Sequence, residues 1–545
     1  MNFFSKLLYL GALATFSLSA YAQTSDKPKD NWQNLDLKTD GMFGISTEKA
    51  YQELLKGKTA KPVIVAVIDG GVDVNHEDLK SVIWVNSKEI SGNGNDDDNN
   101  GYVDDVYGWN FIGSAKGNVH YDNTELVRLI RKLQPKYASA LNSTPFTEAE
   151  RKEFTFYQKL ITDYMTKLQK AQMGQANTYL FKQYLDEILK KMGNDKPDLA
   201  AFEAYKTANE IEGKVIKAVK SELKKNPDID KIKEDIVEGI KYYDAELKYH
   251  LNLDFDSRDT VGDDYSNSHE RFYGNADVIG PDAEHGTHVA GIIGAVRDNN
   301  IGVKGVASHV KIMAIRTVPD GDERDKDVAN SIRYAVDNGA KIINMSFGKD
   351  YAWDKPVVDE AVKYAMSKDV LLVHAAGNDG KNLDKTINYP NPQYVDSLGV
   401  NMGKGAAWLE VGASKWKNDE DLVADFSNYG QKSVDVFAPG VKINSTYPNN
   451  TYKDNDGTSM ASPVVAGLAA IIRSYYPKLN AVQVKEIIMN SVTKVDQKVK
   501  VKDEGISKKV PFSEVCVSGG IVNAYKAILL AEKVKSSSGV NLDTN

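Results

Sequence analysis

Short apolar runs alternate with helical patterns in two separated parts of the chain. Residues 63–68 form a continuous β-branched run of the kind found in buried central strands. Further along, three strand-like runs alternate with two helical patterns, at residues 310–315, 327–338, 341–345, 357–368 and 370–373. This alternation predicts a doubly wound α/β domain with a mostly parallel sheet.

The stretch between residues 123 and 250 has a different composition, rich in Lys, Glu, Leu and Tyr and poor in Gly. Apolar residues recur at helical spacing within it, at Ile161, Tyr164, Met165 and Leu168. Similar patterns follow at residues 179–192, 199–223 and 229–251. We expect an all-α insertion, a bundle of three to five helices. Its sequence leaves open whether it is a structural buttress, a lid or a substrate-selecting arm.

The first 22 residues are organised like a secretory signal peptide. Lys6 supplies the positive charge, residues 7–18 the apolar core, and Ala20-Tyr21-Ala22 a cleavage site. The apolar core is too short to cross a membrane, and no other run approaches the roughly 20 residues that a transmembrane helix needs. We therefore expect an extracytoplasmic protein, secreted or periplasmic after cleavage near Ala22, with no transmembrane segment.

These patterns divide the chain into five parts. They are a signal peptide (1–22), a first part of the α/β domain (23–122), the helical insertion (123–250), a second part of the α/β domain (251–535) and a polar tail (536–545). The tail is expected to be disordered.

Composition narrows the functional classes. A chain of 545 residues with 41% hydrophobic residues can bury a large core. Its net charge of −8 argues against a nucleic acid partner. The single cysteine, Cys516, excludes an internal disulfide framework, and its position in a strand-like run predicts a buried structural thiol.

Three segments bring candidate chemistry to this framework. Asp69 ends the first apolar strand, His285 begins an apolar helix, and Ser459 lies at the start of another. A serine hydroxyl becomes a nucleophile when a histidine takes its proton and a carboxylate orients that histidine. The chain order Asp, His, Ser differs from that of the α/β-hydrolases, and Gly-Thr-Ser-Met-Ala does not match their Gly-x-Ser-x-Gly elbow.

Two other histidines, His76 and His288, lie close to these motifs. His76 lies in a turn after Asp69 and is expected at the surface. His288 is three residues from His285 on one helix, a spacing that two zinc ligands can use, but no third ligand is nearby in the sequence. We therefore assign the base to His285 and expect His288 to point into the helix packing.

Three long motifs occur in that order: Val-Ile-Asp-Gly-Gly-Val-Asp around Asp69, His-Gly-Thr-His-Val-Ala-Gly from His285, and Gly-Thr-Ser-Met-Ala-Ser-Pro around Ser459. The chain thereby resembles the subtilase family of serine peptidases, over roughly residues 32–120 and 251–533. The resemblance implies a three-layer α/β sandwich with a mostly parallel, subtilisin-like sheet, interrupted between Asp69 and His285 by the all-α insertion. It also implies that Ser459 attacks, His285 moves the proton and Asp69 orients His285.

The same resemblance implies further site residues. Asn378, in Ala-Ala-Gly-Asn, would stabilise the oxyanion together with the Ser459 backbone N–H. The substrate would lie along a backbone edge, a pocket of small residues and a pocket floor, formed by Ser346, Phe347, Gly348, Ala375, Ala376, Gly377 and Asn388. None of these is charged, so we expect uncharged, mostly apolar residues before the cut bond.

An acidic, glycine-rich loop at residues 93–105 suggests a structural calcium site. Asp96, Asp98 and Asn100 alternate ahead of Gly101, as in the first half of a Ca²⁺ loop, and Asp104 follows. Residue 107, where such loops place a bidentate glutamate, is a tyrosine. A solvated acidic turn is the alternative.

Together these features predict a serine endopeptidase that acts on protein or peptide substrates through an acyl-enzyme and needs no cofactor for catalysis. Two alternatives remain open from the sequence: a catalytically idle interaction protein that uses the helical insertion, and an esterase with the same triad. Turnover of peptides, compared with turnover of esters alone, separates the peptidase from the esterase. The sequence does not indicate the oligomeric state.

Overall fold

The computed structural model describes residues 27–396, 400–503 and 505–536. The expected signal peptide and all but the first residue of the expected tail lie outside the described residues. The chain forms two compact units. We call residues 28–125 with 256–536 the α/β unit and Leu126–Phe255 the helical unit. In the described part of the chain, no helix combines the length and apolarity needed to cross a membrane.

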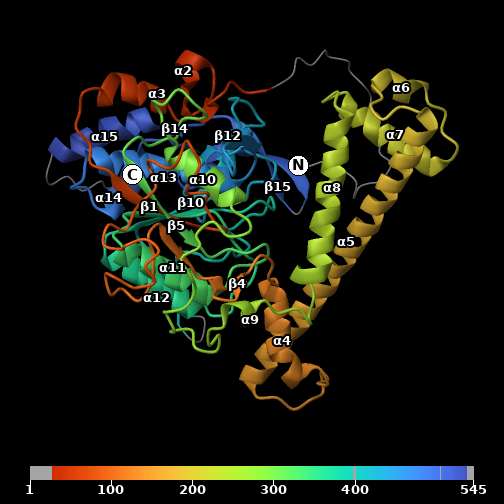
Figure 1. Cartoon of the computed structure of the whole chain (residues 1–545), viewed down its shortest axis with the longest axis horizontal. Helices are drawn as coiled ribbons and strands as arrows, with labels where there is room; N and C mark the ends of the chain where they lie inside the picture. The colour runs from red at the N-terminus through yellow and green to blue at the C-terminus, as the bar shows by residue number, and fades with distance from the viewer. Residues whose placement is uncertain (1–26, 397–399, 504, 537–545) are drawn as a thin grey trace. The chain divides into compact units, whose positions relative to one another are not determined.

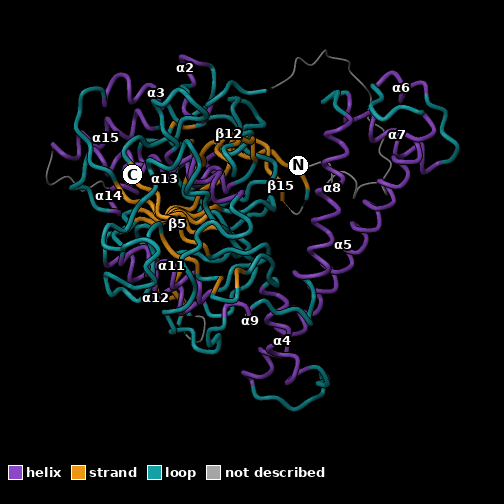
Figure 2. The backbone as a smooth tube through the Cα atoms, in the orientation of Figure 1, coloured by secondary structure: helices purple, strands orange, loops and turns teal. Residues whose placement is uncertain are grey.

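A nine-stranded sheet forms the middle of the α/β unit (Figures 1 and 2). Every neighbouring pair is parallel except one at the edge, where β14 and β17 are antiparallel. In spatial order the strands are β14 (Thr493–Lys494), β17 (Gly520–Ile521), β11 (Val436–Pro439), β10 (Trp408–Ser414), β7 (Leu371–Ala375), β6 (Ile342–Met345), β1 (Val63–Asp69), β5 (Val310–Arg316) and β2 (Gly108–Asn110). The expected mostly parallel α/β sheet is confirmed.

Alternate residues of β1 enter two different cores, because successive side chains of a strand point to opposite faces. Val65 and Val67 join one core, while Ala66 and Ile68 join the other. The first core takes residues from α10 (Glu284–Gly294), α13 (Thr458–Tyr475), α14 (Ala481–Asn490) and α15 (Ala524–Ser536), and from short helical segments between residues 32 and 55. Two helices contribute to the second: α11 (Asp325–Asp337) and α12 (Lys355–Ser367). The result is the three-layer sandwich that the resemblance implied.

Shorter elements complete the α/β unit. Helical segments are η1 (Trp32–Asn34), α2 (Leu37–Asp40), α3 (Thr47–Ala50), η2 (Tyr51–Leu55), α9 (Arg258–Val261) and η4 (Phe512–Glu514). Four small hairpins pair β3 (Gly113–Ser114) with β4 (Gly117–Asn118), β8 (Gln393–Val395) with β9 (Asn401–Lys404), β12 (Ile443–Tyr447) with β13 (Thr451–Asn455), and β15 (Lys498–Asp503) with β16 (Ile506–Pro511).

The helical unit is built on one 45-residue helix, α5 (Glu148–Met192). Thr147 begins it with a capping box, and Gly193 ends it in the left-handed conformation at φ 61°. The unit's other elements are α4 (Glu125–Tyr137, whose first residue belongs to the α/β unit), α6 (Leu199–Ala204), α7 (Glu210–Leu223), α8 (Ile229–Ala245) and η3 (Glu246–His250).

Apolar residues of α5, α6, α7 and α8 share one core in this unit, including Phe181, Phe202, Val219 and Ile232. The helical patterns expected at residues 161–168 and 179–192 belong to the single helix α5. Only Gly174 could have interrupted it, and a Cβ there would lie 2.2 Å from the Tyr243 ring. That glycine therefore permits close packing of α8 and leaves the helix unbroken.

Two local expectations were wrong. His76 does lie in a turn, but it is fully buried, because its Nε2 lies 3.1 Å from the Thr451 carbonyl and its ring packs edge-on against Tyr452. Cys516 is buried as expected but lies in a turn after η4, not in a strand.

Candidate active site

Asp69 is the last residue of β1, at the carboxyl end of a central strand where parallel sheets collect functional groups. Its side chain is 4% exposed. Oδ1 accepts a 2.8 Å hydrogen bond from the Gly70 N–H and another, also 2.8 Å, from Nδ1 of His285. A buried carboxylate thus fixes the orientation and the tautomer of one histidine.

His285 lies in the first turn of α10, and the residue after it allows the helix to approach β1. A Cβ on Gly286 would lie 2.1 Å from the Gly71 carbonyl oxygen and 3.0 Å from Cβ of Asp69. Only glycine fits this contact without moving backbone atoms. The sequence Asp-Gly-Gly on the strand and His-Gly on the helix therefore brings the imidazole against the carboxylate.

The environments of His285 and His288 shift their pKa values in opposite directions. Partial desolvation lowers the pKa of His285, but the charge and hydrogen bond of Asp69, aided by Asp282, outweigh it, so the pKa is raised above 6.5. The His285 side chain remains 42% exposed. Burial lowers the pKa of His288 to about 4, and its Nε2 donates to the Lys453 carbonyl at 2.9 Å. His288 thus packs inside the fold, as expected.

Ser459 lies in the first turn of α13 and is held against the carboxyl end of β6. Its hydroxyl donates to the Ser346 carbonyl at 3.1 Å, and the Ser346 hydroxyl donates to the Ser459 carbonyl at 2.9 Å. In turn, Asn344 donates to the Ser346 hydroxyl at 2.9 Å and accepts from Ser462 at 2.8 Å. This chain of bonds fixes the backbone of Ser459.

The sheet brings the three candidate residues to one edge. β1 and β6 are parallel neighbours with Ile68 opposite Met345, so their carboxyl ends lie side by side. Asp69 ends β1 and bonds His285, whereas Ser346 comes directly after β6 and bonds Ser459. In the described structure the Ser459 hydroxyl donates to the Ser346 carbonyl, and a proton transfer to His285 would require it to rotate away from that carbonyl.

Asn378 follows β7, the next parallel strand, and its amide orientation is determined by its neighbours. Oδ1 accepts hydrogen bonds from the Thr458 N–H at 2.9 Å and the Thr458 hydroxyl at 3.0 Å. A backbone N–H can only donate, so the atom facing Thr458 is the amide oxygen. Asn378 is exposed, and its amide nitrogen lies 3.7 Å from where a Cβ on Gly457, the residue before α13, would be.

Four of the expected substrate residues lie around the amide of Asn388, namely Gly348, Ala375, Ala376 and Gly377. Its nitrogen lies 3.3 Å from the Ala376 carbonyl and 3.5 Å from that of Ala375. Its oxygen lies 2.8 Å from where a Cβ on Gly348 would be, so a side chain at 348 would collide with it. The amide spans the ends of β6 and β7, and these residues contribute no charge to the space between them.

Sequence reasoning missed the residues that hold this site in place. Thr458 orients Asn378, while Asn344 and Ser462 support Ser346. Asn344 could have been noticed, because it is the one polar residue in the apolar run 342–345. Nothing local identifies Thr458, which forms part of the motif around Ser459 but acts on a residue 80 positions away.

The acidic loop between β1 and β2 gathers three carboxylates. One oxygen each from Glu89, Asp96 and Asp98 lies within 4.8 Å of the others. Glu89 was not among the expected ligands. Its Oε2 is buried and has no hydrogen-bond partner in the described structure. A buried carboxylate oxygen without a donor, beside two further carboxylates, fits a hard cation such as calcium.

The other two expected ligands have different partners. Asp104 accepts hydrogen bonds from three successive backbone N–H groups, those of residues 92–94. The Asn100 side-chain oxygen accepts from the Tyr102 N–H at 2.8 Å. Both side chains therefore shape the loop in this structure.

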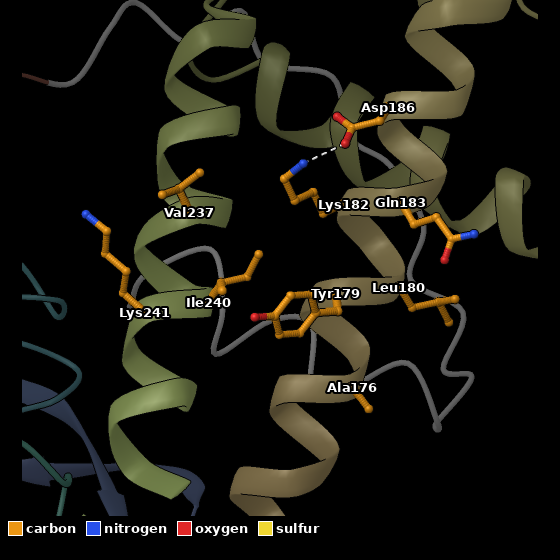
Figure 3. Close-up of a pocket in the computed structure, with 9 residues that line it drawn as sticks. All are labelled: Ala176, Tyr179, Leu180, Lys182, Gln183, Asp186, Val237, Ile240 and Lys241. Carbon is orange, nitrogen blue, oxygen red and sulfur yellow. Dashed lines mark hydrogen bonds and ion pairs between the residues drawn. The ribbon is translucent and has the colours of Figure 1, made fainter. Parts of the chain in front are cut away.

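A groove of about 800 Å³ lies between α5 and α8, entirely within the helical unit (Figure 3). Its apolar lining comes from Ala176, Tyr179, Leu180, Val237 and Ile240. Lys182 and Asp186 on its border bond each other at 2.6 Å. The groove contains none of the residues of the sheet edge described above.

Comparison with known proteins agrees with this geometry. The family model for the subtilase family, Peptidase_S8, matches residues 60–509. Subtilisin BL of Lederbergia lenta is 37% identical over 210 residues, which cover 38% of this chain and 70% of the relative. Subtilisin DY of Bacillus licheniformis is 39% identical over 211 residues, with 38% and 70% covered. A thermostable alkaline protease of Halalkalibacterium halodurans is 30% identical over 335 residues, covering 57% of this chain and 87% of the relative.

The two histidines of α10 provide an internal comparison for titration. We expect His285 to titrate above 6.5 and His288 near 4 in NMR spectra of the imidazole protons. Asp69→Asn removes the charge that favours the imidazolium, so the His285 pKa should fall while that of His288 stays low. A His285 pKa that Asp69→Asn leaves unchanged would contradict the contact with Asp69.

Proposed function

Since the chain belongs to the subtilase family of serine endopeptidases, we propose that it cleaves peptide bonds through Asp69, His285 and Ser459 and a covalent acyl-enzyme. The observation that supports this most directly is the 2.8 Å bond between Asp69 and His285 at the sheet edge that also holds Ser459. The intact set of residues argues against a catalytically idle protein.

The chemistry follows from these positions. The Ser459 hydroxyl attacks the carbonyl carbon while Nε2 of His285 takes its proton. Negative charge develops on the carbonyl oxygen, where the Asn378 amide and the Ser459 N–H donate hydrogen bonds. The imidazolium gives its proton to the leaving amine, and the C–N bond breaks. Water, activated by the same histidine, then hydrolyses the ester to release the acid and restore Ser459.

The substrate binds as an extended peptide in this proposal. Ser346, Phe347 and Gly348 provide a backbone edge for it, and the side chain before the cut bond enters the space bounded by Ala375, Ala376, Gly377 and Asn388. Because the two alanines and Gly377 have small side chains or none, they leave this space open, and the Asn388 amide forms its floor. The enzyme acts on protein or peptide substrates outside the cytoplasm, after cleavage of the signal peptide near Ala22.

The acidic loop holds a structural calcium ion in this proposal, with Glu89, Asp96 and Asp98 as its carboxylate ligands. The buried Glu89 oxygen that lacks a donor supports this role. Asp104 and Asn100 shape the loop that presents those ligands. The ion serves stability and has no part in the peptide-bond chemistry.

The catalytic assignments are tested by two substitutions. Ser459→Ala should remove nearly all peptidase activity while leaving the fold intact. Asn378→Ala should lower kcat by about 10²–10³-fold with little change in KM, because the amide stabilises charge that exists only in the transition state. Steady-state kinetics on a chromogenic peptide measures both. Near-normal turnover by Ser459→Ala, or a pure KM effect of Asn378→Ala, would refute the respective role.

Calcium binding is tested by thermal unfolding with and without a chelator. A ligand at a hundredfold excess over its Kd stabilises the folded state by about 2.7 kcal/mol. Chelator should therefore lower Tm, and Asp98→Ala should abolish the sensitivity. Asp97→Asn is the matched control, because Asp97 lies beside Asp98 but contacts Ile90 and Asn93. Identical melting curves with and without chelator would favour a solvated acidic turn.

The uncharged pocket predicts the cut-site preference. Peptides with an apolar residue before the cut bond should be cleaved with a kcat/KM about 10-fold or more above those with Lys or Arg, because a buried cation would lack a counter-charge. Asn388→Asp should narrow that ratio. Asp384 is the nearest acidic residue in the sequence before Asn388, but it already accepts hydrogen bonds from the Lys432 N–H and the Ser433 hydroxyl. We therefore do not expect it to supply that counter-charge. Strict cleavage after paired basic residues would contradict the pocket assignment.

The role of the helical unit is tested by replacing residues 126–255 with a short Gly-Ser linker. Glu125 and Asp256 must stay, because they form ion pairs within the α/β unit. A lid or substrate-selecting arm predicts a folded enzyme with unchanged or faster cleavage of small peptides and broader selectivity among large proteins. A buttress predicts insoluble or inactive protein. Wild-type rates on both substrate sizes would exclude all three roles.

A further inference from the structure

Lys349 is a fully buried cation that follows directly after the substrate edge Ser346–Gly348. Its side chain is 1% exposed. The ammonium group lies 2.7 Å from Glu125 Oε2, 2.7 Å from Asp325 Oδ1 and 2.7 Å from the Glu323 carbonyl oxygen. An ammonium has three hydrogens, so these three acceptors satisfy it completely.

The backbone of Lys349 binds the floor of the substrate pocket. Its N–H donates to the Tyr389 carbonyl at 2.9 Å, and the Tyr389 N–H donates back at 3.0 Å. Asn388, the residue before Tyr389, lies against Gly348 and bonds Ala376. One residue thus joins the substrate edge and the pocket floor, while its side chain is fixed on a third segment, residues 323–325.

That third segment is itself held firmly. Arg324 pairs with Asp122 at 2.7 Å and with Asp256 at 3.1 Å. Lys349 is therefore tied to a part of the fold that other ion pairs already immobilise. Buried ion pairs contribute little net stability, because desolvation offsets their attraction, so the clearest consequence of this one is geometric.

We propose that Lys349 is a positioning residue for extended peptide substrates, a role that rests on the proposed function. By tying the substrate edge and pocket floor to residues 323–325, it holds both in their binding geometry before the substrate arrives. Because the edge is already ordered, substrate binding does not include the free-energy cost of ordering the edge. The resulting increase in affinity is expected for peptides that bind along the edge. It is expected to be smaller for a substrate that presents a single residue.

The test compares two buried lysines of similar chemistry. Lys326 is 2% exposed and is bonded by Asp263, by Glu270 and by the Asp264 carbonyl, but it has no bond to the substrate edge or pocket floor. Lys349→Met and Lys326→Met each leave two carboxylates without their lysine, so both should lower Tm. Kinetic constants are measured for a tetrapeptide amide and a single-residue ester, per active site titrated with a serine-directed phosphonate.

Lys349→Met should lower kcat/KM for the tetrapeptide by about 10- to 100-fold, mainly through KM, since small misplacements of a binding edge have effects of this size. The ester should change less than about threefold, and Lys326→Met should leave both KM values near wild type. An unchanged tetrapeptide KM in Lys349→Met, or equal KM changes in the two variants, overturns the proposal.

If Lys349→Met does not fold, the neutral triple variant Glu125→Gln, Asp325→Asn, Lys349→Met replaces it, because it removes the two unpaired buried charges. A raised tetrapeptide KM in that variant supports positioning by Lys349, and a wild-type KM refutes it. Failure of the proposed function would give a different result, since the phosphonate would then label no active site in the wild-type enzyme.

Discussion

The contact between the first turn of α10 and the end of β1 is the constraint on which the candidate active site depends. At Gly286 the helix lies so close to the Gly71 carbonyl that no side chain fits between them. This approach allows Asp69 and His285 to share a 2.8 Å hydrogen bond while the carboxylate stays buried. A helix displaced by the width of one methyl group would separate the imidazole from the charge that raises its pKa.

The rest of the site follows from parallel strand geometry. β1, β6 and β7 are consecutive neighbours, so the residues after each strand meet at one edge although they are far apart in the chain. Helix α13 adds Ser459 from the adjoining layer, and Thr458 connects that helix to Asn378. Ser346 fixes Ser459 and Thr458 fixes the amide of Asn378, and neither neighbour has a chemical step assigned to it. Such contacts set the direction of a polar group before a substrate binds.

Much of this could be predicted from sequence because the relevant signals are local. Apolar runs of strand length indicated the sheet, and three contiguous motifs indicated Asp69, His285 and Ser459. What escaped prediction depends on contacts between distant positions. Glu125 and Lys349 are 224 residues apart, and nothing near either residue indicates the pair. His76 is polar and lies in a turn, yet a carbonyl and an aromatic ring from a distant hairpin bury it completely.

The ion pairs at Glu125 and Asp256 also bear on how such a chain could have arisen. Asp256 and Glu125 flank the helical unit, and both are bound, through Arg324 and Lys349, to neighbouring residues of a single segment. The 130 residues of the helical unit are therefore inserted between two nearby points of the α/β unit, where a short surface loop would also connect the chain. Bringing the two ends of a long inserted segment together costs little more conformational entropy than bringing the ends of a short loop together. The α/β unit is thus suited to carry a different insertion at this position, with its sheet, its core and the edge that holds Asp69 and Ser459 left in place.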